Sequence, residues 1–495
     1  MTAVPTATGA DDAAARSSAT GSAGTGRRGD ATGGVAPVSA DRAVAQLAEF
    51  AVGCRGGAIP DGVPERILDI LGLALAAQDD PAVRAVLASV RRWGGTPEAT
   101  VIGAGDRLPA PAAALVNGVM AHALDFDDTH LPSVLHPSAG IVPAALAAAE
   151  ATGADGPSLV RAVAAGIEIC NRLGMAAYDR ELRNSVFFER GLHATSICGT
   201  IGGAAAAGLL YGLDAAGIAH AMGIAASMGA GLIEANRTGG TVKKTHCGWA
   251  AHAGVSAAVF AADGLTGPPT VLEGRFGFFA AYTSGVFDAD ALLGGLGERW
   301  ELSRTVYKPY PTNHFTHPGI DCALALRAAG LRAADVASIE LGVAAPVLRT
   351  IAEPAADKAR PQTAYHGKFS GPYTVATALL GGGGLGVGTA DFERLDDEVL
   401  ALAARVTCVP DERATEIFPN AFAAVLRVRT VDGRVLEHRV DASRGSAAHP
   451  LHADDLDLKF RLNAAGLSAE QAAAVSAAAR SLRPAAELVA LTRCR

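Results

Sequence analysis

The sequence predicts a mainly α-helical protein with a large helical domain, a smaller α+β unit and a return to helices at the end. Segments rich in Ala, Leu, Val and Ile, with lengths typical of helices, dominate residues 39–303. Strand-like alternation appears within residues 304–445, and helical periodicity resumes in residues 446–495. Since the chain has 495 residues and is 49% hydrophobic, it can bury a large core divided between two domains. We therefore expect the last helices to pack back onto the first domain.

The N-terminal segment, residues 1–38, is mostly Ala, Gly, Thr and Ser, and this composition predicts a disordered tail. Arg27 and Arg28 are not followed by an apolar segment, so they do not indicate an export signal. Ser39 is the expected N-cap of the first helix. Further helices are expected at residues 63–77, 111–124, 140–151 and 158–176.

Residues 200–235 form a long stretch rich in Ala and Gly that is apolar enough to suggest a membrane-spanning helix. Asp214 and His220 interrupt it, and the sequence of residues 211–214, Tyr-Gly-Leu-Asp, is typical of a turn. We therefore expect two closely packed core helices here.

The α+β unit is indicated by two stretches, residues 336–347 and 424–440, in which apolar and polar side chains alternate. Asp432 and Gly433 lie in the middle of the second stretch and predict a hairpin turn.

Composition narrows the possible partners. A formal net charge of -8 gives no basic surface for nucleic acid or for an anionic membrane. The seven cysteines are scattered without a CxxC pair, which indicates reduced thiols, a cytoplasmic location and no zinc or iron–sulfur site.

The first cluster of polar residues is HALDFDDTH at residues 122–130, followed by His136. Three carboxylates and three imidazoles lie within fifteen residues, and such crowding perturbs pKa values. For Asp127 and Asp128, helix capping explains their presence at least as well as a functional role. Asp and His also suit a divalent cation, but the HExxH pattern of zinc enzymes is absent.

Three further clusters add cations and imidazoles. His193 precedes a helix expected to begin near Ser196, where an isolated His is more often structural than catalytic. Lys243 lies between apolar helices, and lysines are seldom placed there unless paired or functional, so we expect it to face inward. Lys308 begins a stretch, residues 308–318, that three prolines stiffen where the chain leaves the helical domain.

In this order and spacing, the motifs DFDDTH, HPS, GLHAT, KKTHCG, KPYPTNHFTHPGID, KFSGPY and DLDLKF resemble the MmgE/PrpD family. The family includes 2-methylcitrate dehydratase, cis-aconitate decarboxylase and an epimerase of an imino-dicarboxylate, which work without metal or organic cofactor. The resemblance implies a large all-helical domain, made from residues 39–303 and 446–495, with an α+β lid domain of residues 304–445 inserted between these parts. It also implies a homodimer.

Carried over motif by motif, the resemblance implies roles for individual residues. The residues expected to be catalytic are His136, His193, Asp125, Lys243 and Tyr373. The residues expected to bind the substrate are Thr129, Lys308, His246 and His130. No metal ligand is expected. Asn313 stands where some decarboxylases of the family have a His, so the substrate stays open.

The expected function is that of a cofactor-independent lyase, which removes water or carbon dioxide from a small di- or tricarboxylic acid by proton transfer. Three alternatives remain open: an epimerase or isomerase that uses the same acids and bases, a non-catalytic binding protein, and a metal-dependent hydrolase. The expected partner is a small carboxylic acid, with no nucleic acid and no membrane.

Overall fold

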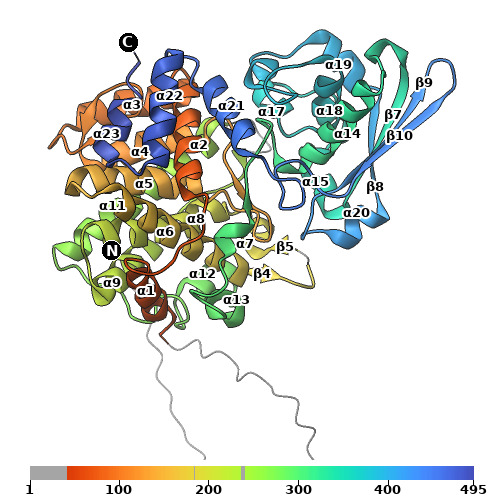
Figure 1. The fold of residues 1–495 in the computed structure, drawn as a ribbon. Coiled ribbons are helices and arrows are strands. Elements are labelled where there is room, and N and C mark those ends of the chain that lie inside the picture. The colour runs from red at the N-terminus through yellow and green to blue at the C-terminus, as the bar shows by residue number, and fades with distance from the viewer. Residues whose placement is uncertain (1–41, 183, 236–239, 495) are drawn as a thin grey trace, which may run out of the picture. The chain divides into compact units, whose positions relative to one another are not determined.

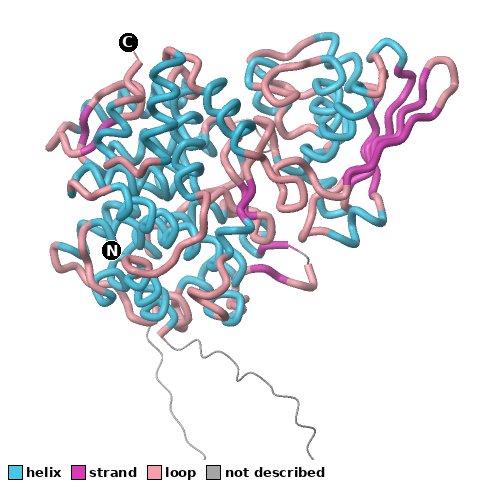
Figure 2. The backbone as a smooth tube through the Cα atoms, in the orientation of Figure 1, coloured by secondary structure: helices cyan, strands magenta, loops and turns pink. Residues whose placement is uncertain are grey.

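The computed structural model describes residues 42–182, 184–235 and 240–494, all within one compact unit. The predicted tail and the predicted N-cap Ser39 lie outside these residues. Helices make up most of the described secondary structure, so the predicted mainly α fold is confirmed (Figure 2).

The first part of the chain forms a bundle of helices. Its helices are α1 (Ala43–Gly53), α2 (Val63–Ala76), α3 (Pro81–Trp93), α4 (Ala110–His122), α5 (Ser138–Thr152), α6 (Gly156–Ala176), α7 (Val186–Glu189), α8 (Ala194–Leu210), α9 (Ala215–Ala226), α11 (His246–Ala262), α12 (Phe278–Thr283) and α13 (Ala289–Leu293). The 3₁₀ turn η1 (Thr241–Thr245) directly precedes α11. Short antiparallel pairs join β1 (Ala99–Thr100) to β2 (Arg107–Leu108), β3 (Thr129–His130) to β6 (Thr305–Val306) and β4 (Tyr178–Asp179) to β5 (Asn184–Ser185).

The long apolar stretch is divided into α8 and α9, as predicted. Asp214 caps α9, because its carboxylate accepts a hydrogen bond from the backbone N–H of Gly217 at 2.8 Å. A search of the described residues finds no helix whose length and hydropathy would let it span a bilayer.

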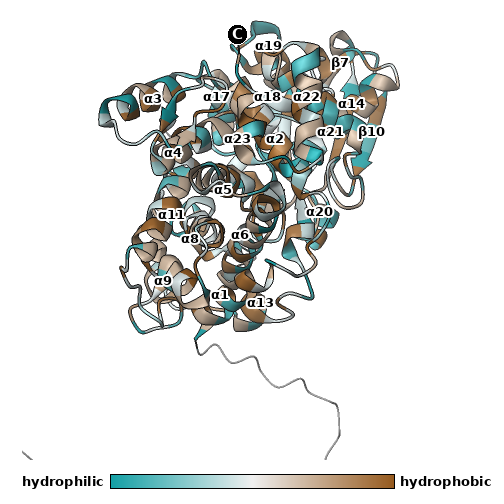
Figure 3. Cartoon of the chain, turned by 60° about the vertical axis from the view of Figure 1, so that its left-hand side comes forward, coloured by the Kyte–Doolittle hydropathy of each residue, from teal (hydrophilic) through white to brown (hydrophobic). Residues whose placement is uncertain are grey.

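Close helix crossings in this bundle depend on glycine. Helix α11 packs against α4 and α8, and α8 also packs against α6. A Cβ atom added to Gly118 would lie 2.7 Å from the Cα atom of Gly248, and one added to Gly166 would lie 2.7 Å from the carbonyl oxygen of Gly202. Tan and brown residues dominate these helices in Figure 3, as expected for a bundle that buries nearly every side. The Gly118–Gly248 crossing places the end of α4 beside the start of α11.

The α+β part contains a sheet of four strands in the order β10-β9-β7-β8. These strands are β7 (Val336–Val343), β8 (Val406–Pro410), β9 (Ala424–Thr430) and β10 (Val435–Val440). Its helices are α14 (His317–Ala328), α15 (Leu348–Ile351), α16 (Ala355–Ala359), α17 (Ala364–Gly367), α18 (Gly371–Leu380), α19 (Asp397–Ala403) and α20 (Glu412–Ile417). Helix α14 packs on β9 and β10, and α18 packs on α14 and β8, which encloses a second hydrophobic core.

The predicted hairpin is confirmed, because β9 pairs with β10 across a turn in which Gly433 has a φ of 88°. The strand predicted over residues 336–347 ends earlier, at Val343. Pro346, which has no N–H to give to a sheet, lies instead in a 3₁₀ turn over Ala345–Val347.

The chain ends in helices α21 (Ala453–Asn463), α22 (Ala469–Arg480) and α23 (Ala485–Ala490). Helices α21 and α22 pack on α2, and α23 packs on α5 (Figure 1, where the C-terminal helices are dark blue). Phe460, Val475 and Leu488 belong to the first hydrophobic core, together with residues more than three hundred positions earlier.

Candidate active site

The loop between α4 and α5, residues 123–137, carries the DFDDTH motif. Asp125 has a φ of 54°, in the left-handed region that residues other than glycine seldom adopt. The Nζ atom of Lys308 donates to the carbonyl oxygen of Asp125 at 2.9 Å and lies 3.2 Å from its Oδ1. Because both contacts converge on the strained residue, Lys308 holds this turn in place.

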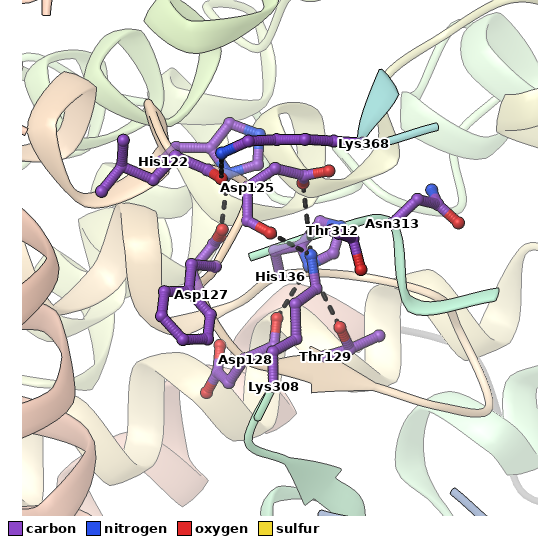
Figure 4. Close-up of polar contacts among 12 residues, drawn as sticks. His122, Asp125, Asp127, Asp128, Thr129, His136, Lys308, Thr312, Asn313 and Lys368 are labelled. Atoms are coloured by element: carbon purple, nitrogen blue, oxygen red, sulfur yellow. Dashed lines mark hydrogen bonds and ion pairs between the residues drawn. The ribbon is translucent and has the colours of Figure 1, made fainter. Parts of the chain in front are cut away.

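Asp125 is contacted by a second lysine. The Nζ atom of Lys243 lies 3.3 Å from the same Oδ1, and all three side chains are buried (Figure 4 shows the contact with Lys308). Burial raises the pKa of Asp125, but Lys243 and Lys308 outweigh burial and hold that pKa well below its usual value. We call these residues, one carboxylate and two ammonium groups, the cavity-side cluster.

A third lysine lies above this turn. The Nζ atom of Lys368 donates to the carbonyl oxygen of Leu124 at 2.8 Å (Figure 4). Burial lowers the pKa of Lys368 to about 7, although the carboxylate of Asp125 opposes the shift. The ammonium form of Lys368 therefore loses its proton close to neutral pH.

Four imidazoles form a continuous row beside the cluster, which we call the imidazole row. The rings of His136 and His122 are 5.5 Å apart, those of His122 and His193 are 5.6 Å apart, and those of His193 and His246 are 5.1 Å apart. These side chains come from the 123–137 loop, from the end of α4, from the N-cap of α8 and from the first residue of α11. The close α4–α11 crossing brings the row together.

The tautomer of His136 follows from its partner. Its Nδ1 lies 2.7 Å from the carbonyl oxygen of Asp128, which can only accept, so Nδ1 carries the hydrogen and Nε2 is left free to act as a base. Burial, helped by Lys308, lowers the pKa of His136 to about 3. Burial, helped by Lys243, also lowers the pKa of His193 well below its usual value. Both imidazoles are therefore neutral at pH 7.

Two ion pairs lie on the other side of the loop, against the helices, and we call them the core-side pairs. Arg66 contacts Asp128 at 2.9 Å, and Lys459 of α21 contacts Asp69 of α2 at 2.8 Å. Lys459 also donates to the carbonyl oxygen of Phe126 at 3.0 Å. The DLDLKF motif thus supports the loop from behind.

A cavity of about 1070 Å³ opens next to these groups. Of the predicted site residues, His136, His193 and Lys243 line it, and Asn313 lines it as well. The cavity wall comes from both parts of the molecule, since Phe188 of α7 and Phe418, which follows α20, also line it.

Four predicted residues lie behind this lining. Asp125 and Lys308 contact each other, Thr129 Oγ1 lies 3.3 Å from Nδ1 of His136, and Nδ1 of His246 lies 3.0 Å from Nδ1 of His193. None of the four is among the cavity-lining residues of the described chain. Lys308, expected to bind substrate, is fully buried, and it instead contacts Asp125.

The structure does not bring His130 into the site. Successive side chains of a strand point to opposite faces, so when Thr129 of β3 faces His136, His130 faces away. Its Nδ1 lies 2.6 Å from Ser133 Oγ, and its Nε2 lies 3.4 Å from Glu301. His130 is therefore an internal contact of the fold, not part of the cavity.

Tyr373 is likewise away from the cavity. It lies in α18, fully buried in the second hydrophobic core, and its hydroxyl oxygen accepts from the backbone N–H of Asp396 at 3.3 Å. The KFSGPY motif contributes different residues to the site, because Lys368 contacts the loop and the ring of Phe369 lies 5.0 Å from Nζ of Lys243.

His122 and Asp127 form a contact that was not predicted from the sequence. The Nδ1 atom of His122 lies 2.8 Å from Oδ2 of Asp127, with both side chains fully buried (Figure 4). Both residues belong to the first polar cluster, but their spacing fits a capped helix end equally well. Only the neighbouring rings on either side of His122 distinguish a role in the site from the capping of a helix end.

His122, Asp127 and Cys247 could also hold a metal ion, since their ligand atoms lie within 4.8 Å of one another. The hydrogen bond between His122 and Asp127 would have to break, and burial raises the pKa of Cys247 well above its usual value, which opposes the thiolate a metal requires. The arrangement fits a hydrogen-bonded pair better than a metal site.

The site as a whole is a cavity with ammonium groups and neutral imidazoles at its wall, which suits an anionic acid that gains or loses a proton. The MmgE/PrpD N-terminal domain matches residues 45–289, and the MmgE/PrpD C-terminal domain matches residues 310–483. This protein therefore belongs to the MmgE/PrpD family.

Several relatives match most of the chain. Human cis-aconitate decarboxylase is 30% identical over 426 residues, covering 83% of this chain and 85% of the relative. Mouse cis-aconitate decarboxylase is 28% identical over 418 residues, with coverages of 82% and 83%. The cis-aconitate decarboxylase-like protein oryM of Aspergillus oryzae is 26% identical over 441 residues, with coverages of 84% and 89%.

Proposed function

We propose that this protein is a cofactor-independent lyase that acts on a small di- or tricarboxylic acid by proton transfer. The observation that carries the proposal is the convergence of His136, His193 and Lys243 on one cavity. The similarity to cis-aconitate decarboxylases supports the same reaction class.

Substrate binding is assigned to the cavity-side cluster. Lys243 and Lys308 carry two positive charges against the single negative charge of Asp125, so the cluster keeps a net positive charge for a substrate carboxylate. Lys243 lines the cavity and makes the direct contact, while Lys308 and Asp125 fix its position. Burial strengthens this attraction because little water screens it.

Proton transfer is assigned to His136 and His193. In a decarboxylation, the bond to the leaving carboxylate breaks, its electron pair stays on the adjacent carbon, and that carbon takes a proton as carbon dioxide departs. In a dehydration, one imidazole removes a proton beside a carboxylate, and another group protonates the hydroxyl that leaves as water. Each positioned acid or base contributes about 10²- to 10⁴-fold.

We further propose that residues 304–445 act as a lid domain inserted into a helical domain formed by residues 39–303 and 446–495. Two separate hydrophobic cores support this division. The cavity supports it as well, because its lining includes residues from both proposed domains. A homodimer is proposed on the resemblance to the family. Exposed apolar side chains on α3 and α11, such as Trp93 and Trp249, are available for a second copy to cover.

The test is a product assay by mass spectrometry over citrate-like acids, including cis-aconitate and 2-methylcitrate, in ordinary and in deuterated water. A lyase releases carbon dioxide or water from at least one acid, and activity persists with a chelator. Deuterium exchange without either loss identifies an epimerase instead. Loss of activity with a chelator, restored by a metal, contradicts cofactor-independent chemistry.

A further inference from the structure

His122 and Asp127 form a buried pair that the proposed roles leave unused. Each side chain is fully buried, and each keeps one polar atom, Nε2 of His122 and Oδ1 of Asp127, without a hydrogen-bond partner among the described residues. Leaving such buried polar atoms unpaired costs folding free energy. A purely structural pair would gain nothing from this arrangement.

The tautomer of His122 is determined by its partner. Burial raises the pKa of Asp127, but the neighbouring imidazoles of His122 and His136 lower it to about 2, so Asp127 is a carboxylate at neutral pH. A carboxylate only accepts hydrogen bonds, so Nδ1 of His122 must carry the hydrogen. The unpartnered Nε2 is then the atom that can take up and release a proton.

The position of His122 in the imidazole row indicates a role for its Nε2 atom. Among the described residues, its ring is the only one in the imidazole row with a carboxylate at hydrogen-bond distance, and it stands between His136 and His193, the two members of the row that line the cavity. The titratable groups facing it are Asp127 and Asp125 on the loop, the neutral imidazoles of its two neighbours and the thiol of Cys247 in α11.

We propose that Asp127 and His122 are positioning residues that hold the proton exchanged with the cavity-lining imidazoles. Resting on the proposed function, the step is as follows: His122 takes a proton from solvent at Nε2, and the ionised Asp127 stabilises the resulting imidazolium through its contact with Nδ1. Nε2–H then passes this proton to the free ring nitrogen of His136 or His193, which gives it to the substrate carbon, and His122 returns to the neutral form with its hydrogen on Nδ1. No bond to His122 or Asp127 other than N–H is made or broken.

The first test needs no substrate. In protein labelled with ¹⁵N-histidine, NMR should show His122 protonated at Nδ1, with a downfield resonance for the hydrogen shared with Asp127. In Asp127→Asn this resonance should disappear, because the amide no longer requires Nδ1 to donate. An unchanged His122 tautomer in a folded Asp127→Asn protein contradicts the proposal, whether or not any acid is turned over.

The second test uses the acid that the product assay identifies. Asp127→Asn should lower kcat about 10- to 100-fold, shift the pH dependence of kcat and change KM less than about 3-fold, with Asp127→Glu restoring part of the activity. Asp128→Asn is the matched control, since Asp128 is equally buried in the same loop but pairs with Arg66. It should lose stability and keep the wild-type pH dependence.

If the two Asn variants keep the same pH dependence of kcat, Asp127 is structural and the proposal fails. If wild-type protein turns over none of the acids, the proposed function fails instead, and the NMR experiment still decides whether the pair exists.

Discussion

The cavity-side cluster and the core-side pairs lie on opposite sides of one loop, yet their charge balance differs. The core-side pairs match one cation to one carboxylate, Arg66 to Asp128 and Lys459 to Asp69. The cavity-side cluster sets two ammonium groups against Asp125. Balanced pairs meet the needs of the fold, whereas an excess of positive charge beside a cavity leaves room for an anion. The comparison therefore separates residues expected to matter for activity from residues expected to matter for stability.

The largest effect is expected in the cavity-side cluster. Lys243→Ala should lower kcat/KM at least about 10²-fold, because it removes the ammonium group that meets the substrate carboxylate, and His193→Ala should lower kcat about 10²- to 10⁴-fold. Thermal unfolding should show that both proteins remain folded.

The matched control is Lys244→Ala. Lys244 is adjacent in sequence and nearly as buried, but it pairs with Asp80 and does not line the cavity. Equal losses of activity in Lys243→Ala and Lys244→Ala would remove the distinction between the two lysines.

The next effect is expected in a core-side pair. Lys459→Met should lower the free energy of unfolding by about 3–5 kcal/mol, because Asp69 would stay buried without its cation. Adding Asp69→Leu should recover most of this loss, since no buried charge then remains. Urea unfolding measures the free energy of unfolding of the single and the double variant. A Lys459→Met protein as stable as the wild type would show that the pair contributes little to the stability of the fold.

Acid should destabilise the protein through its buried imidazoles. Burial lowers the pKa of His130 to about 4, below the value of about 6.5 expected in the unfolded chain. A depressed folded-state pKa gives stability that is complete above the unfolded value and is lost as pH falls toward the folded one. Between pH 6.5 and 5, His130 alone should account for up to about 2 kcal/mol.

Urea unfolding at pH 6.5 and at pH 5 tests this effect. The free energy of unfolding of His130→Gln should fall less with acid than that of wild-type protein. A parallel fall in the two proteins would show that His130 takes up its proton as readily in the folded state as in the unfolded chain.

The smallest effect is expected for the ion pair between Arg349 of α15 and Glu189 of α7, at 2.7 Å. Both residues line the cavity, but Arg349 keeps half of its side chain exposed. Such pairs contribute about 0.2–1 kcal/mol, so Arg349→Ala should barely change stability. Thermal unfolding at low and high salt checks this, and a loss above about 2 kcal/mol would show that the pair is more shielded than its exposure indicates.

Much of the fold was predictable where its sequence patterns are local. The turn at residues 211–214 and the hairpin at Asp432-Gly433 each depend on neighbouring residues, and both were found. The early end of β7 was missed, although Pro346 carried the signal.

The site was predictable in part. Polar motifs identified His136, His193 and Lys243, which do meet at one cavity. Sequence could not show that α4 and α11 cross at Gly118 and Gly248, or that the ring of His122 lies between those of His136 and His193.

Two predicted site residues lie away from the cavity for one reason. Tyr373 and His130 belong to motifs whose other residues lie nearer the cavity, so motif membership alone does not place a residue at its wall. Which residue of a motif reaches the cavity depends on the direction of a strand or the packing of a helix. Neither can be deduced from the spacing of the residues in the sequence.

The most direct test of the proposed site is a crystal structure with the acid that the product assay identifies. We predict a substrate carboxylate within about 3 Å of Nζ of Lys243, with the reacting carbon beside His136 or His193. An acid that binds elsewhere, leaving Lys243 in contact with Asp125 alone, would contradict it.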